Sequence, residues 1–120
     1  MNRASRDCRI AAANLRRDEV FTDAVVFFAP QAVEKALKAF LAAYDHPFPK
    51  THDLERLVGW CETIEGGFAA FLGAARTLTP YAIKFRYPGG PQEPEMAEAQ
   101  EALRLAEEIV QFVRDRILEE

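Results

Sequence analysis

The sequence predicts an all-α protein: an up-and-down bundle of about five helices forming one domain over residues 1–120. Three observations predict this class. Apolar residues recur at helical spacing in several segments, and no stretch alternates for long enough to form a strand. The chain has 120 residues, 49% of them apolar, which is enough for one hydrophobic core and excludes a mainly disordered protein.

The first two helices are expected between Arg3 and Arg17, with Ser5 as a candidate N-cap, and from Phe21 to Tyr44. The second has apolar residues around most of its circumference. A helix so apolar needs cover on several sides, and one short bundle is not expected to supply it all, which favours a dimer. Pro30 lies inside this helix and predicts a kink near residues 26 and 27.

A narrow polar stripe follows the second helix and consists of Gln31, Glu34, Lys35 and Lys38. Glu34 and Lys38 are four residues apart, which favours an ion pair on the helix surface. A solvated or subunit-facing edge is the preferred interpretation of this stripe, ahead of a catalytic row.

The middle of the chain is predicted from its helix-breaking residues. Residues 46–53 form a rigid connector with two prolines, and Thr51 or Asp53 caps a short helix that reaches Cys61. The Gly66-Gly67 pair breaks the chain, and a further helix runs from Phe68 to Thr79-Pro80.

The last third of the chain is predicted as a loop and one long helix. The segment from Tyr81 to Pro94 holds several prolines and glycines, which indicates a turn and an ordered loop. The last helix then runs from Pro94 to Leu118, with Pro94 in its first turn.

The charge balance argues against general affinity for a nucleic-acid backbone, because 15 Lys and Arg face 19 Asp and Glu. The two ends differ in sign. Five arginines lie within residues 1–17, and nine acids lie within residues 93–120. Two interpretations remain open: the ends steer a partner, or the terminal helices pair with each other, which is the preferred one.

Metal, redox and membrane functions find little support in the sequence. Cys8 and Cys61 have no metal-ligand spacing and are expected to be buried thiols in a reducing compartment. His46 and His52 lie six residues apart across two prolines, and no phosphate-binding loop follows a strand. No apolar run approaches a membrane span, and no signal peptide is evident, so a soluble, cytoplasmic protein without cofactors is expected.

One segment concentrates residues that bind nucleotides, namely Tyr81, Lys84, Arg86 and Tyr87. Cationic side chains donate to a phosphate, and aromatic rings stack on a base. A structural interpretation stands beside this one, with the tyrosines packed on the bundle end and Arg86 paired to an acid of the last helix. His52 is similarly open to two roles, as a structural residue at a helix start or as an acid or base.

Three blocks of sequence resemble one known family. They are Phe27-Phe-Ala-Pro-Gln-Ala-Val-Glu-Lys-Ala-Leu-Lys-Ala-Phe-Leu, Lys50-Thr-His-Asp-Leu-Glu-Arg-Leu and Tyr81-Ala-Ile-Lys-Phe-Arg-Tyr-Pro-Gly. The chain resembles the small HEPN (higher eukaryote and prokaryote nucleotide-binding) proteins of bacteria and archaea. The resemblance implies a helical bundle that dimerises through its central helices, often encoded beside a minimal nucleotidyltransferase as a toxin–antitoxin-like pair. Pro30 departs from it, since the pattern usually has Gln there.

Active HEPN ribonucleases carry an Arg and a His with four to six residues between them. Arg86 stands where that Arg would stand, but Pro91, Gln92 and Glu93 occupy the places for the His. Three hypotheses therefore remain. The preferred one is a nucleotide- or RNA-binding homodimer with a nucleotidyltransferase partner. The others are a metal-independent ribonuclease that uses Arg86 with His52, and an interaction-only dimer.

Overall fold

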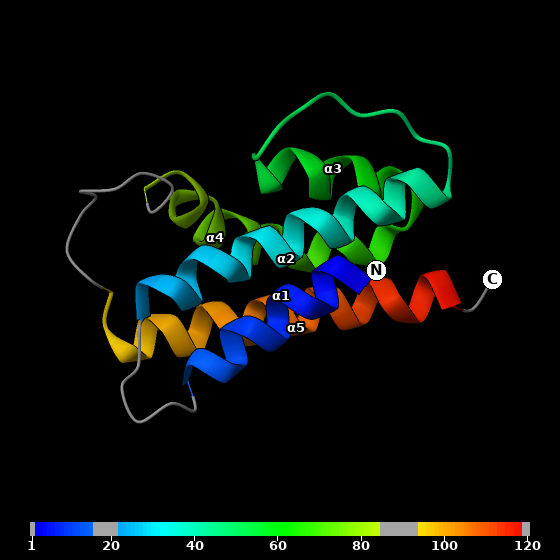
Figure 1. Cartoon of the computed structure of the whole chain (residues 1–120). Helices are drawn as coiled ribbons and strands as arrows, with labels where there is room; N and C mark the ends of the chain where they lie inside the picture. The colour runs from blue at the N-terminus through cyan, green and yellow to red at the C-terminus, as the bar shows by residue number, and fades with distance from the viewer. Residues whose placement is uncertain (1, 16–21, 85–93, 119–120) are drawn as a thin grey trace.

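The protein is a bundle of five α-helices (Figure 1), seen in a computed structural model that describes residues 2–15, 22–84 and 94–118. No strand occurs in these ranges, which confirms the predicted all-α class. The elements are α1 (Asn2–Leu15), α2 (Thr22–Ala43), α3 (Leu54–Ile64), the 3-10 helix η1 (Gly66–Phe71), α4 (Leu72–Lys84) and α5 (Met96–Leu118). Because α1 begins at Asn2, Ser5 lies inside this helix and is not its N-cap.

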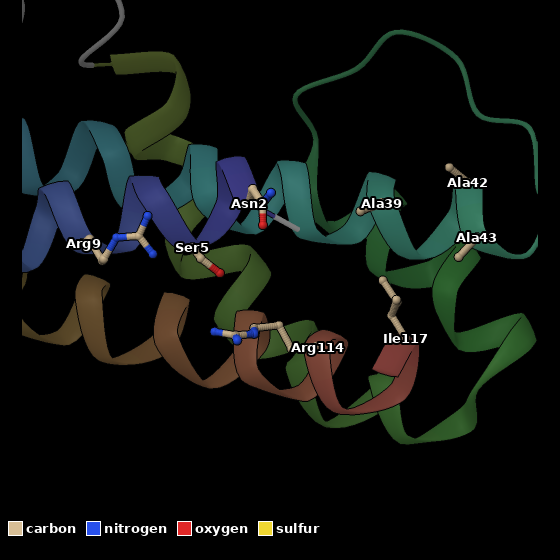
Figure 2. A pocket seen from close by; sticks show the side chains of 8 residues that line it. All are labelled: Asn2, Ser5, Arg9, Ala39, Ala42, Ala43, Arg114 and Ile117. Atoms are coloured by element: carbon tan, nitrogen blue, oxygen red, sulfur yellow. The ribbon is translucent and has the colours of Figure 1, made fainter. Parts of the chain in front are cut away.

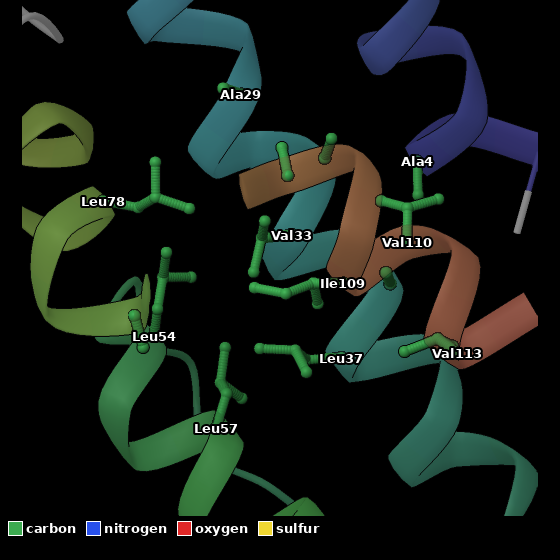
Figure 3. Packing of buried hydrophobic residues seen from close by; sticks show 14 of the residues in the cluster. Ala4, Ala29, Val33, Leu37, Leu54, Leu57, Leu78, Ile109, Val110 and Val113 are labelled. Atoms are coloured by element: carbon green, nitrogen blue, oxygen red, sulfur yellow. The ribbon is translucent and has the colours of Figure 1, made fainter. Parts of the chain in front are cut away.

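Helix α2 is the centre of the bundle and packs against α1, α3, α4 and α5. Figure 3 shows Val33 and Leu37 of α2 among Leu54 and Leu57 of α3 and Ile109 of α5. Nine apolar side chains along α2 are fully buried within one chain: Val25, Val26, Ala29, Ala32, Val33, Ala36, Leu37, Phe40 and Leu41. Phe27, Phe28 and Ala39 are partly exposed. For these nine residues the expectation that a second subunit is needed is wrong, because the four surrounding helices cover them.

The connector between α2 and α3 turns back along α2. Phe48 has its ring centroid 6.0 Å from Lys38 Nζ, and further along the chain His52 contacts Glu34. Helix α3 then runs in the same direction as α2, since Cys61 Sγ donates to the Leu37 carbonyl. As predicted, Asp53 caps α3: its Oδ1 accepts from the backbone N–H groups of residues 55 and 56.

The break after α3 falls at Glu65, whose extended backbone (φ −134°) separates α3 from η1. The predicted break at the glycines is thus displaced by one residue, and residues 68–71 form 3-10 turns where an α-helix was expected. Gly67 has a packing role. A Cβ built there would lie 2.9 Å from Cζ of Phe112, so a side chain does not fit between η1 and α5 without a shift.

Helix α4 continues through Pro80 to Lys84, so the prediction that it ends at Thr79-Pro80 is wrong. Proline removes the hydrogen bond to the carbonyl of Arg76, but Arg76 and Pro80 are exposed, and water can hydrate that carbonyl. Thr79 Oγ1 donates to the Ala75 carbonyl at 2.8 Å, which adds a side-chain hydrogen bond within the same turn.

Helix α5 begins at Met96, so Pro94 precedes the first turn and does not belong to it. The first backbone hydrogen bond of the helix runs from Ala99 N–H to the Glu95 carbonyl. The Pro94 carbonyl instead accepts a hydrogen bond from Thr22 Oγ1 at 2.6 Å. This bond joins the starts of α2 and α5 at one end of the bundle (Figure 1).

The terminal helices do not pair through their charges in the described part of the chain, contrary to the preferred expectation. Arg3, Arg6 and Arg9 lie on the exposed face of α1, where they form no ion pair with a described acid of α5. Arg104 of α5 pairs within its own helix, with Glu101 and Glu108. The ion pair that α1 does make joins its buried Asp7 to Lys35 of α2 at 2.6 Å.

No helix within the described ranges combines the length and the apolar character needed to cross a lipid bilayer.

Candidate functional site

The nucleotide-binding residues expected from the sequence lie at and beyond the end of α4. Tyr81 and Lys84 belong to its last turn, which corrects the prediction that the segment from Tyr81 onwards is a loop. Arg86 and Tyr87 lie outside the described residues. Positions 81 and 84 are three residues apart. Because this segment is helical, the two positions are neighbours on one face of α4.

Tyr81 joins the end of α4 to the start of α5. Its hydroxyl donates a hydrogen bond to Oε2 of Glu98 at 2.9 Å. Burial and the neighbouring Glu98 raise the pKa of the Tyr81 phenol above its ordinary value, so the hydroxyl keeps its proton at neutral pH and remains a donor. In the structural interpretation, the tyrosines pack on the bundle end, and Tyr81 does contact α5 there. Its other part, an ion pair between Arg86 and an acid of the last helix, concerns a residue outside the described ranges.

His52 contacts a carboxylate of the polar stripe on α2. Its Nδ1 lies 2.7 Å from Oε1 of Glu34, and Oε2 of Glu34 accepts a hydrogen bond from Lys38 Nζ at 3.2 Å. The second distance confirms the predicted Glu34–Lys38 pair. A carboxylate that accepts from Nδ1 fixes the orientation and tautomer of an imidazole. The contact therefore suits two roles: it orients the imidazole of His52 for proton transfer, and it fastens the connector before α3 to α2.

The start of α3 lies against α4. The backbone N–H of Leu54, two residues after His52, donates to Thr79 Oγ1 at 3.3 Å. Thr79 is in turn two residues before Tyr81. The segment that carries His52 therefore lies close to the C-terminal half of α4, where Tyr81 and Lys84 are located.

Sequence reasoning identified His52 but missed Glu34 as its partner. The two residues are 18 positions apart and are joined by a proline-containing connector, so no helical or strand spacing relates them. The signal that was available is indirect: an acid on an otherwise solvated stripe and a histidine beside a helix start.

The thiols are not suited to nucleophilic chemistry. Cys61 is fully buried, as expected, whereas Cys8 is half-buried. Burial raises the pKa of the Cys8 thiol to about 11 and that of Cys61 to about 12, so both are protonated at neutral pH. Within the described ranges, no three His, Cys, Asp or Glu side chains gather into a group that suits a metal ion.

Comparison with protein families gives a match that spans nearly the whole chain. The model of the HEPN domain matches residues 1–116. No curated protein and no solved structure matches the chain. The family match supports a function related to nucleotides or RNA in general terms, and HEPN domains commonly dimerise. It agrees with the resemblance of the three sequence blocks and with the all-helical bundle, and the chain therefore belongs to the HEPN domain family.

Proposed function

We propose that this HEPN domain binds a nucleotide or an RNA end as a homodimer, with Tyr81, Lys84, Arg86 and Tyr87 as the contacting residues. The family match over residues 1–116 is the observation that carries this proposal. The four residues supply both parts of the chemistry. Arg86 and Lys84 donate charge-assisted hydrogen bonds to phosphate, and the tyrosine rings offer faces on which a base stacks.

The hydrogen bond between Tyr81 and Glu98 supports the role of the Tyr81 ring. It holds the phenol oxygen on α5 and limits the rotation of the ring at the end of α4. A ring that is already ordered loses less conformational entropy when a base stacks on it. Tyr81 therefore acts as a stacking platform, and its hydroxyl is engaged with Glu98.

A binding titration with Arg86→Ala tests the proposal. Loss of a charge-assisted hydrogen bond to phosphate costs about 1.5–3 kcal/mol, so the affinity for a nucleotide or a short RNA falls by a factor of ten or more. Arg76→Ala is the matched control, because Arg76 is an exposed arginine of α4, the helix that carries Tyr81, and pairs with Glu55 of α3. Equal binding by both variants would refute a role for Arg86.

The homodimer is tested by the mass of the protein in solution. Since the core-facing residues of α2 are covered within one chain, their burial does not require a dimer, and the proposal rests on the frequency of dimers among HEPN domains. Light scattering at micromolar concentration is expected to give twice the 13.5 kDa mass of one chain. A particle of 13.5 kDa would contradict the homodimer.

The protein partner in this proposal is a minimal nucleotidyltransferase, with which the chain forms a toxin–antitoxin-like pair in the cytoplasm. The support is the resemblance of the three sequence blocks to proteins that are often encoded beside such an enzyme. A reading frame for a small nucleotidyltransferase next to this one, and a complex of the two purified proteins, are the expected findings. Failure of the two purified proteins to associate would refute the partnership.

A second candidate function is a metal-independent ribonuclease, and the contact between His52 and Glu34 favours it. The oriented imidazole would move a proton at the 2′-hydroxyl or the leaving oxygen, while Arg86 steadies the phosphate charge. The missing His at positions 91 to 93 argues against this activity. RNA cleavage that survives purification and disappears in both Arg86→Ala and His52→Ala would establish it. An interaction-only dimer would bind no nucleotide and cleave no RNA.

A further inference from the structure

A pocket of about 570 Å³ lies between α1 and α5, and the C-terminal end of α2 forms its floor (Figure 2). No residue of α4 lines it. Two arginines from different helices line it, Arg9 of α1 and Arg114 of α5. In Figure 2 their guanidinium groups extend towards each other, with the hydroxyl of Ser5 between them. The rest of the lining consists of Asn2, Ala39, Ala42, Ala43 and Ile117.

Neither arginine is neutralised by a described acid. Within residues 2–15, 22–84 and 94–118, no carboxylate lies at ion-pair distance from Arg9 or Arg114. Two like charges that face one pocket repel each other, and an anion placed between them removes that repulsion and accepts hydrogen bonds from both.

The described acids nearest to the pocket in sequence do not pair with Arg9 or Arg114, because they bind other residues or lie outside the pocket lining. Asp7 of α1 is buried and bound to Lys35, and Asp115 of α5 accepts a hydrogen bond from Gln111. Glu107 lies close enough to Cys8 to raise the pKa of its thiol, but it does not line the pocket. It precedes Arg114 by seven residues, which is two helical turns or about 10 Å along α5.

The floor of the pocket does not oppose an anion. A helix C-terminus normally presents partial negative charge from carbonyl groups without partners. At the end of α2, three of the last four carbonyls are occupied: those of residues 40, 41 and 42 accept from the backbone N–H groups of Tyr44, His46 and Asp45. The alanine side chains also leave room for a ligand to reach the arginines.

A second pocket, of about 460 Å³, continues the basic surface across α1. It shares Asn2 and Ala39 with the first and is also lined by Arg3, Lys35 and Lys38. Lys35 and Lys38 are balanced by Asp7 and Glu34, whereas Arg3 forms no ion pair with a described residue. The surface therefore carries unbalanced positive charge on both sides of the first turn of α1, although the whole chain has a net charge of −4.

We propose that the pocket between α1 and α5 is a binding site for a phosphate group, with Arg9 and Arg114 as its guanidinium ligands and Ser5 as a hydroxyl donor. A phosphate suits it because guanidinium groups bind phosphate oxygens in a bidentate manner and the hydroxyl supplies a further donor. The phosphate belongs either to a free nucleotide or to an RNA backbone. This site is separate from the one proposed at the end of α4, and each can fail without the other.

Calorimetric titrations of the full chain test the site with three probes: inorganic pyrophosphate, ATP and a short single-stranded RNA. The variants are Arg9→Gln, Arg114→Gln and Arg114→Lys, and the matched control is Arg6→Gln. Arg6 is exposed on α1 like Arg9 but does not line the pocket. Loss of either arginine is expected to weaken binding about tenfold or more, and Arg6→Gln to change it little. Arg114→Lys keeps the charge but not the guanidinium fork, so its affinity should lie between that of the wild type and that of Arg114→Gln.

The pattern across probes identifies the source of the phosphate. Binding of ATP and pyrophosphate that depends on both arginines indicates a free nucleotide, whereas dependence limited to RNA indicates a backbone phosphate. If Arg9→Gln and Arg6→Gln weaken binding equally, the loss comes from the general charge of the surface, and the site is overturned. Wild-type affinity in both Arg9→Gln and Arg114→Gln would also overturn it. Absence of binding to all three probes would overturn it too. Binding that Arg86→Ala abolishes and the pocket variants leave intact would refute this site and support the one at α4.

Discussion

The Nδ1 atom of His52 lies 2.7 Å from Oε1 of Glu34, and the other oxygen of this carboxylate accepts from Lys38. One acid on α2 thus holds both a neighbour on its own helix and the segment that leads into α3. The same geometry suits a structural tie and an oriented proton-transfer group, and two substitutions of His52 distinguish these roles.

We predict that His52→Asn leaves the fold and nucleotide binding close to those of the wild type, because the Asn amide can still donate to Glu34. His52→Ala removes the donor, and since the imidazole is half exposed, its loss lowers the free energy of unfolding by about 0–1 kcal/mol. Thermal unfolding and a metal-free RNA cleavage assay are the measurements. We expect no RNA cleavage by the wild type or by either variant. A wild-type cleavage rate that falls by about 10²–10⁴-fold in both variants would show proton transfer by His52.

The contact between Asp7 and Lys35 predicts an asymmetric loss of stability. In Lys35→Met the buried Asp7 carboxylate loses its cation, so the free energy of unfolding should fall by about 3 kcal/mol. Asp7→Asn leaves the lysine free to reach water and should cost less, about 1–2 kcal/mol. Urea denaturation measures both, with Arg104→Gln on the exposed face of α5 as a control that should not move the midpoint. Equal midpoints for the two Asp7–Lys35 variants would contradict the burial of Asp7.

Gly67 and Gly66 form a matched pair of adjacent glycines. A Cβ at position 67 would lie 2.9 Å from the Phe112 ring, which is itself packed against Phe68 and Phe71, whereas nothing lies within 4 Å of a Cβ at position 66. Gly67→Ala should therefore destabilise the protein by about 1–3 kcal/mol through overpacking. Gly66→Ala should have a midpoint equal to or slightly above the wild type, as measured by chemical denaturation. A stable Gly67→Ala variant would mean that the Phe112 ring moves aside without cost.

Pro30 lies inside α2 and is buried, and it has no N–H to donate to the carbonyl of Val26. Replacement by Ala restores that hydrogen bond and the helix propensity without burying a polar amide, as Gln would. Pro30→Ala should therefore melt at the same temperature as the wild type or higher, as followed by circular dichroism. A clear fall in melting temperature would show that the packing of the bundle depends on the proline ring.

The parts of the fold that the sequence predicted are those governed by local pattern. The bounds of α2 and α5 came within two residues because their apolar positions repeat over six turns, and Asp53 was recognised as a cap from its place before a helix. Local pattern does not predict the continuation of α4 past Pro80, because proline usually ends a helix, whereas here water can hydrate the exposed carbonyl that loses its partner.

Contacts between distant segments were beyond the reach of local pattern. The return of the connector along α2 pairs His52 with Glu34, and the packing of α1 on α5 brings Arg9 and Arg114 to one pocket. Neither relationship has a sequence spacing, because each depends on which helix faces lie together. For the proposed nucleotide site, the residue types indicate the chemistry, and the structure adds the Tyr81–Glu98 hydrogen bond.

Titration of the ¹⁵N-labelled protein with a nucleotide or a short RNA, followed by NMR, tests the central claim most directly, since it reports binding and its location together. We expect the largest shifts of backbone amides to fall on residues 81–87, and we expect Arg86→Ala to remove them while Arg76→Ala does not. Absence of shifts at ligand concentrations well above a millimolar Kd, or shifts that leave residues 81–87 unchanged, would contradict it.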